Sequence, residues 1–414
     1  MASNNGAVLP DAPPPPAPGV AAAQAAMDDL IAQAAPPGPA ASAAATPADH
    51  GLHFIDSAQF QQAHYPLRWL IPGVLVRGQP AVLGGPRKAL KTSVLVDLAL
   101  SLGARIEAPF LDRFPVETRV RVGLMSGESG EAALQEIARR IATSKRICLA
   151  AASVHWCFRL PQLGRPGDLA ALRSLIGDLG LEVVIIDPLY LCLFGAGDDA
   201  NAAANLFRMG PLLADVSRAC LEAGATPILA HHARKNRGPD ERYEPLELED
   251  LAFAGIQEFA RQWLLLGRRE AYVPGTGMHR LWLGAGGSAG HSGLWGVDVY
   301  EGPYDDEDGR WWGVTVTTAD EARAAAVAAK QGQKESAHLS RVARDAANVV
   351  DFLRGRPAGE TRTAIRESLG ISGGRVGAAV LHLLKAGEVV ETEITKNGKM
   401  QTAIRLAHGP GTGT

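Results

Sequence analysis

The segment between residues 81 and 100, AVLGGPRKALKTSVLVDLAL, restricts the fold of this chain more than any other stretch. An apolar, strand-like run enters a glycine-rich turn, which opens directly onto a helix with Lys91, Thr92 and Ser93 in its first turn. Backbone N–H groups at a helix N-terminus, together with a lysine charge, form a site for phosphate oxygens. The segment therefore predicts a strand, a phosphate-binding loop and a helix, in that order.

The loop follows the pattern G-x-x-x-x-G-K-[ST] except that Leu90 replaces the second glycine. Lys91 is expected to reach the β and γ phosphates of a nucleotide, and the Thr92 hydroxyl to ligate Mg²⁺. A plain Gly/Pro turn with basic residues on the surface is the alternative. The expected nucleotide contacts in the loop are Gly84, Gly85, Pro86, Arg87, Lys88, Ala89, Leu90, Lys91, Thr92 and Ser93.

Two later acidic residues each follow a predicted strand. VVIIDPLYL is a buried strand closed by Asp187, and a carboxylate there is expected to contact the nucleotide's Mg²⁺, usually through water. The strand at residues 120–125 runs into SGES, so Glu128 lies just past its end, where ligands of open α/β sheets bind. Glu128 is the candidate general base for the attacking water. Capping of the following turns is the alternative for both acids.

Histidines and arginines end two further strands. TPILA is followed by His231 and His232, and one of them is expected to contact the γ-phosphate. A metal pair is the alternative, but adjacent strand residues point to opposite faces and no further ligand is close in sequence. WLLLG is followed by Arg268 and Arg269, either an arginine finger that acts across a subunit interface or solvated arginines.

Strand-like and helix-like segments alternate from about residue 52 to residue 318, the pattern of an α/β fold with a mostly parallel sheet flanked by helices. Residues 294–300 and 311–317 alternate with period two, which predicts an antiparallel edge hairpin. The expected parts are an Ala/Pro-rich disordered tail (1–50), a nucleotide-binding domain (51–318), a helical or flexible linker (319–338), a small domain (339–408) and a short tail (409–414).

The phosphate loop at Gly85–Thr92, SGE at Ser126–Glu128, IIDPL at Ile185–Leu189 and AHHARK at Ala230–Lys235 together resemble the RecA-like ATPases. More narrowly, they are similar to the RepA-type hexameric helicases of plasmids and to related AAA-ATPases. The resemblance spans residues 67–318 and implies ATP and Mg²⁺ as cofactors. It also implies a ring or filament with ATP between subunits.

The resemblance assigns a role to each motif residue. Lys91 and Thr92 take the phosphate-binding and Mg²⁺-binding positions, Asp187 that of the Walker B acid, and Glu128 that of the catalytic glutamate. His232 takes the place of the sensor histidine, and Arg268 or Arg269 that of the trans-acting arginine. Residues 195–210 would be loops facing a central channel, and residues 236–251 a mobile loop that contacts DNA.

Residues 339–408 have a periodicity of their own. Helices are predicted at 341–354, 361–369 and 375–385, followed by two strands around Asn397–Gly398, the strongest short hairpin signal. This order resembles a winged helix-turn-helix domain. The resemblance implies DNA binding, with Arg375 in a major groove and Lys396 and Lys399 on backbone phosphates. Contact with a protein partner is the alternative.

Composition limits the remaining choices. The formal net charge is -3, so any DNA-binding surface is expected to be a local patch. The four cysteines lack CxxC spacing, which argues against a disulfide framework or a zinc site, and no uninterrupted apolar run is long enough to span a bilayer. We therefore expect a cytoplasmic ATP-hydrolysing motor or remodeller that acts on DNA. A nucleotide-switched DNA-binding regulator with slow or no hydrolysis is the alternative.

Overall fold

The computed structural model describes residues 54–193, 206–234, 242–252, 255–303, 309–396 and 398–407. The chain divides into two units, residues 1–65 and 66–414. In the first unit a short helix, α2 (Ser57–Gln62), begins with a capping box formed by Asp56 and Gln59. The predicted disordered tail (1–50) lies outside the described residues.

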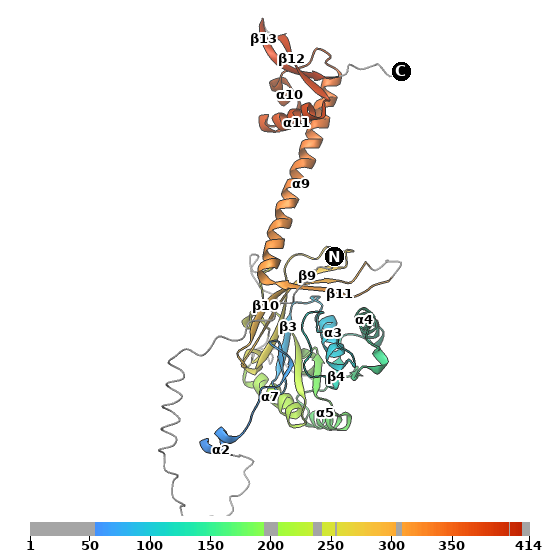
Figure 1. The fold of residues 1–414 in the computed structure, drawn as a ribbon, viewed down its shortest axis with the longest axis vertical. Helices are drawn as coiled ribbons and strands as arrows, with labels where there is room; N and C mark the ends of the chain where they lie inside the picture. The colour runs from blue at the N-terminus through green and yellow to red at the C-terminus, as the bar shows by residue number, and fades with distance from the viewer. Residues whose placement is uncertain are drawn as a thin grey trace, which may run out of the picture. The chain divides into compact units, whose positions relative to one another are not determined.

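A nine-stranded mixed sheet dominates the second unit (Figure 1). Six neighbouring strands, from β8 to β5, are parallel, and three antiparallel strands extend the sheet beyond β8. The predicted mostly parallel α/β sheet is thereby confirmed. In sheet order the strands are β11 (Gly313–Thr318), β10 (Ser292–Tyr300), β9 (Met278–Gly287), β8 (Gln262–Arg268), β3 (Ala81–Gly85), β7 (Thr226–His232), β6 (Val183–Asp187), β4 (Val122–Ser126) and β5 (Val154–Cys157).

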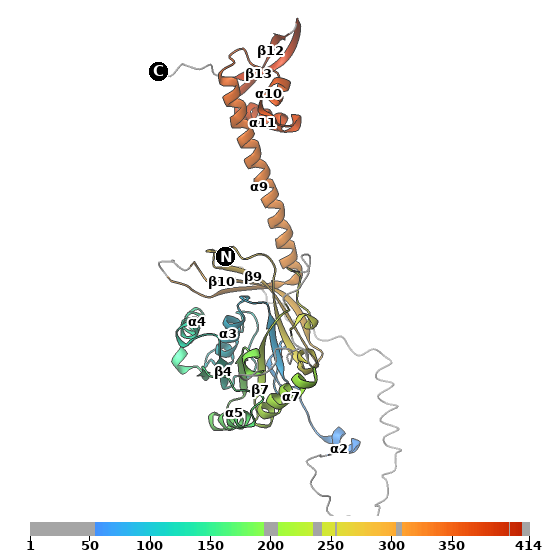
Figure 2. The ribbon, with the colours of Figure 1, turned by 180° about the vertical axis from the view of Figure 1, so that it is seen from behind.

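Helices cover both faces of the parallel strands, and strand β6 shows why its sequence is a continuous apolar run. Val183 and Ile185 face the core under α3 (Lys91–Gly103) and α4 (Glu131–Ser144). Val184 and Ile186 face the opposite core, under α5 (Pro166–Leu179), α7 (Leu206–Glu222) and α8 (Ile256–Phe259). Figures 1 and 2 show α3 beside α4 and α5 beside α7. A strand buried on both faces has no polar alternation.

Several predicted elements are confirmed and others were missed. The hairpin of β10 and β11 is antiparallel, with Trp295 opposite Thr318. Strand β5 and helix α5 were not predicted, because β5 is a half-exposed edge strand and α5 buries only Leu172 and Ile176. The shorter elements are β1 (Trp69–Ile71), β2 (Leu75–Val76), α6 (Tyr190–Leu193) and single 3₁₀ turns at Leu149–Ala151 and Leu248–Asp250.

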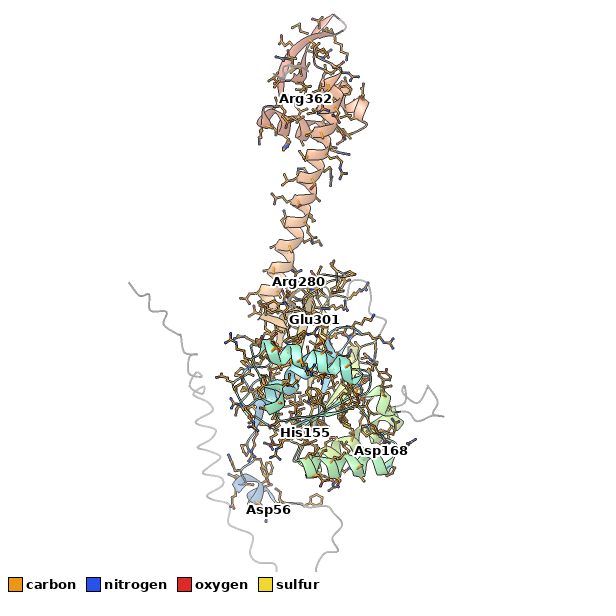
Figure 3. All side chains as sticks on the ribbon, turned by 90° about the vertical axis from the view of Figure 1, so that its right-hand side faces the viewer. Asp56, His155, Asp168, Arg280, Glu301 and Arg362 are labelled. Atoms are coloured by element: carbon orange, nitrogen blue, oxygen red, sulfur yellow. The ribbon has the colours of Figure 1, made fainter. Side chains whose placement is uncertain are left out.

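Two buried carboxylates connect the antiparallel strands to the helices. Asp97 of α3 accepts hydrogen bonds from Trp312 Nε1 (2.7 Å) and the Leu111 backbone N–H (3.0 Å), and it lies 3.1 Å from Lys145 Nζ. Glu301, which follows β10 and is labelled in Figure 3, pairs with Arg140 of α4 at 2.7 Å. Both acids therefore hold the edge of the sheet against α3 and α4.

Helix α9 (Ala319–Arg354) is continuous through the region predicted to be a linker. Thr318 and Glu321 form a capping box at its start. Residues 323–341 are all exposed, so this stretch of the helix has no core to pack against. Of the two predicted forms of the linker, helical or flexible, the structure has the helical one. This helix continues into the first predicted helix of the small domain.

The C-terminal segment has the predicted order of elements and a core of its own. Ala346, Val349 and Leu353 from the last turns of α9 pack against α10 (Arg362–Leu369) and α11 (Gly373–Ala386). Strands β12 (Val389–Lys396) and β13 (Lys399–Leu406) form an antiparallel hairpin. Asn397 in its turn lies outside the described residues. Among the helices that the structure describes, none combines the length and apolarity needed to cross a membrane.

Candidate nucleotide site

The loop after β3 needs glycine at its first position because strand β8 runs close beside it. A Cβ atom on Gly85 would lie 2.7 Å from the backbone oxygen of Leu266. A Cβ on Gly84 would lie 2.3 Å from Cδ2 of Leu251, a side-chain atom that can shift. The backbone contact is the stricter one, so Gly85 is the position at which any side chain would displace the loop.

Leu90 adopts the backbone conformation that explains why glycine is usual at its position. Its φ of 59° and ψ of 22° are left-handed, and it is the residue from which α3 begins. For a residue with a Cβ atom this conformation costs roughly 1–2 kcal/mol. The Leu90 side chain is half-buried against the core beneath α3, and this burial offsets part of the cost. With leucine in place of the usual glycine, the backbone therefore still makes the turn that leads into α3.

Lys91 is the first residue of α3, and its side chain folds back over the loop. Its Nζ donates to the carbonyl oxygens of Gly85 (3.1 Å) and Pro86 (2.9 Å) and lies 3.1 Å from Nδ1 of His232. Burial lowers the pKa of Lys91 to about 8, against the opposing effect of Asp187 and Glu128. Phosphate oxygens are stronger acceptors than these carbonyls and would stabilise the charged lysine.

Thr92 and Asp187 meet where α3 begins and β6 ends. The Thr92 hydroxyl donates to Oδ2 of Asp187 at 2.6 Å. Burial raises the pKa of Asp187, while the bond from Thr92 and the charge of Lys91 oppose this shift. A hydroxyl beside a carboxylate is the hard-oxygen donor set that Mg²⁺ prefers, so these two residues fit the predicted Mg²⁺ contacts.

The two histidines that end β7 have different surroundings. His232 is half-buried, and burial and the charge of Lys91 lower its pKa, so Nδ1 accepts from Lys91 as a neutral ring. His231 is buried and its Nε2 lies 2.7 Å from the Ala252 carbonyl oxygen. Burial lowers the pKa of His231 to about 4. Only His232 therefore lies beside the phosphate loop, and in the described residues no cluster of three or more metal-ligating side chains occurs.

Glu128 reaches the same edge of the sheet from β4. Ser126, at the end of β4, is paired with Asp187, so the bend that carries Glu128 lies close to Asp187. The Glu128 side chain is exposed, and its Oε1 accepts a hydrogen bond from the Tyr190 hydroxyl at 2.5 Å. Sequence reasoning did not identify Tyr190, although a polar aromatic residue shortly after Asp187 was a usable signal.

Lys91, Thr92, Glu128, Asp187 and His232 thus come together at the carboxyl ends of four neighbouring parallel strands. Residues 46–238 match the family model of the AAA domain. The match supports a nucleotide-binding, P-loop ATPase-like domain, which usually requires Mg²⁺. No curated protein matches the chain.

Both candidate arginines lie beyond the region that matches the AAA domain. Arg268 is half-exposed at the end of β8, and its Nη2 donates to the carbonyl oxygen of Lys88 at 2.5 Å, within the phosphate loop of its own chain. Arg269 pairs with Asp298 and lies over the ring of Trp282. This placement favours a structural role for Arg269 and leaves Arg268 as the arginine beside the phosphate loop.

The three candidate DNA contacts lie in the C-terminal segment, also outside the AAA match. Arg375 forms a two-bond ion pair with Asp345, at 2.8 and 2.6 Å. Lys396 pairs with Glu360 at 2.9 Å, whereas Lys399 is exposed on the hairpin. To contact a DNA base, Arg375 would have to give up its ion pair with Asp345. Most of residues 195–210, and residues 236–241 of the second predicted DNA loop, lie outside the described residues.

Proposed function

We propose that this chain is an ATP-hydrolysing, RecA-like motor or remodeller that acts on DNA. The observation that carries the proposal is the convergence of Lys91, Asp187, Glu128 and His232 on one edge of the sheet, from four different strands or their following loops. The match of residues 46–238 to the AAA domain supports nucleotide binding independently of this geometry.

The arrangement gives each side chain a task in hydrolysis. Bound Mg²⁺ would neutralise phosphate charge. Thr92 and Asp187 would hold it, and Lys91 would contact the β and γ phosphates. Glu128, exposed at the end of β4, would take the proton from the attacking water. His232 would exchange its contact with Lys91 for the γ-phosphate and so distinguish ATP from ADP.

We propose that the C-terminal segment binds DNA as a winged helix-turn-helix. The order α9, α10, α11 and hairpin supports this assignment, as does the excess of basic over acidic residues between 339 and 408. Lys399 is the candidate phosphate contact with the least obstruction, because it is exposed. Arg375 is held by Asp345, so we propose DNA binding through the hairpin before base contacts from α11.

The discriminating experiment is steady-state ATP hydrolysis by the full chain, with and without single-stranded DNA. We expect turnover to rise several-fold with DNA and to be lost in Lys91→Ala. Tight ATP binding with negligible turnover in either condition would favour the nucleotide-switched regulator, which the strained Leu90 loop would then explain. If neither ATP binding nor turnover is detected, both functions are wrong.

Assembly with ATP between subunits makes a separate prediction for Arg268. Mixing Arg268→Ala protein with Glu128→Gln protein should restore part of the activity, because some mixed interfaces combine an intact glutamate with an intact arginine. The matched variant Arg269→Ala keeps both Glu128 and Arg268 and loses only the contacts with Asp298 and Trp282, so it should be active by itself and gain nothing from mixing with Glu128→Gln protein. Phosphate release from defined mixtures measures this. No recovery with Arg268→Ala at any ratio would mean that Arg268 acts only on its own chain's loop.

A further inference from the structure

The side chain of Tyr190 contacts two of the candidate catalytic residues, Glu128 and His232. It begins α6, three residues after Asp187, and its hydroxyl donates to Glu128 at 2.5 Å. Its ring lies beside that of His232, with 5.6 Å between the ring centroids and 38° between the planes. Tyr190 therefore connects the glutamate that follows β4 with the histidine that ends β7.

We propose that Tyr190 is a positioning residue that fixes the Glu128 carboxylate and makes its position depend on what occupies the phosphate loop. This inference rests on the proposed ATPase function and extends it. Nothing in the phosphate-loop pattern or in the strand-ending acids assigns Tyr190 a role.

Glu128 needs a positioning partner because its own segment does not hold it. The side chain is exposed in a bend after β4, where an unrestrained carboxylate samples several rotamers. A general base acts only when its oxygen lies within hydrogen-bond reach of the water. Tyr190 binds one carboxylate oxygen, which orients the other for the water. The bond to Glu128 also raises the pKa of Tyr190, so the hydroxyl stays protonated and remains a donor at neutral pH.

The second contact of Tyr190 links Glu128 to the loop. In the structure Lys91 donates to two loop carbonyls and to Nδ1 of His232, and the His232 ring lies against Tyr190. A γ-phosphate would recruit Lys91 by a stronger, charge-assisted bond. His232 would then lose its lysine partner and turn, and the tyrosine ring beside it would move with it. The path from Lys91 through His232 and Tyr190 to Glu128 is continuous in contacts.

The kinetic test compares Tyr190→Phe with the wild-type chain. Loss of one hydrogen bond to a carboxylate should lower kcat by about 10- to 100-fold, with KM for ATP nearly unchanged, because the phenylalanine keeps the ring contact. In a Glu128→Gln background the same substitution should cause less than about a twofold further loss. The matched control is Tyr300→Phe, a half-buried tyrosine on β10 that packs against Trp311, and it should leave kcat unchanged.

Three results would overturn the inference: an unchanged kcat in Tyr190→Phe, an equal loss of kcat in the wild-type and Glu128→Gln backgrounds, or a loss of activity in Tyr190→Phe that is accompanied by a lower melting temperature. The last two would indicate a general structural effect. If the wild-type chain does not hydrolyse ATP, the proposed function is wrong. The role of Tyr190 must then be tested by a measurement that does not require hydrolysis.

That measurement is the NMR signal of the Tyr190 ring carbon that bears the hydroxyl, in tyrosine-labelled full chain, assigned by its absence in Tyr190→Phe. We expect its alkaline titration to shift down in Glu128→Ala, because the bond that raises the pKa of Tyr190 is gone. We also expect the signal to move with a non-hydrolysable ATP analogue and Mg²⁺, but less with ADP. A signal insensitive to both Glu128→Ala and the analogue would overturn the inference.

Discussion

Glu128→Gln is expected to lower the ATP turnover number by about 10²- to 10⁴-fold, the usual contribution of a positioned general base. Glutamine has the shape of glutamate and its carbonyl oxygen still accepts from Tyr190, so the local structure is retained. The substitution removes only the ability to take a proton from water. Nucleotide affinity should therefore stay close to that of the wild-type chain, because Lys91 and Thr92 are unchanged.

The measurement pairs phosphate release with displacement of a fluorescent ATP analogue. Glu131→Gln serves as the matched control, since Glu131 is exposed in the first turn of α4, only three residues further along the chain. Its turnover should be that of the wild type. Wild-type turnover in Glu128→Gln would refute Glu128 as the base and would remove the reason for the Tyr190 contact.

The nucleotide site could be predicted from sequence as far as its features are local. The apolar runs that precede Asp187 and the two histidines predict parallel strands, and the carboxyl ends of such strands meet at one edge of the sheet. The nucleotide site was therefore predicted mainly from the order of Lys91, Glu128 and Asp187 along the chain. Leu90 was a departure from the pattern, and only its left-handed φ shows that the backbone keeps the glycine-like turn.

Features that depend on distant partners could not be predicted. Tyr190 and Glu128 are 62 residues apart, Arg269 and Asp298 29 apart, and Arg375 and Asp345 30 apart. No local period encodes such pairs. Adjacent arginines at a strand end point to different faces, so the sequence could not say which of Arg268 and Arg269 faces the loop.

The largest expected change in stability is for Asp97→Ala, which should lower the free energy of unfolding by about 3 kcal/mol, the lower end of the range for breaking a buried ion pair. The carboxylate is fully buried and accepts from Trp312 Nε1 and the Leu111 N–H while it pairs with Lys145. Its removal leaves these donors without their acceptor. Lys145 keeps a second partner, Asp112 at 3.0 Å, which limits the loss.

Urea unfolding followed by tryptophan fluorescence measures this change in the right part of the chain. All seven tryptophans lie between residues 69 and 312, so the signal reports the sheet domain and not residues 339–408. The matched control is Glu222→Ala, which breaks the exposed pair with Arg173. That pair is shorter, at 2.6 Å against 3.1 Å for Asp97 and Lys145, yet an exposed pair contributes only about 0–1 kcal/mol.

Equal losses in the two variants would show that burial does not set the strength of the Asp97 network. A larger loss in Asp97→Ala, with weaker nucleotide binding, would show that this network holds α3, and with it Lys91, in place.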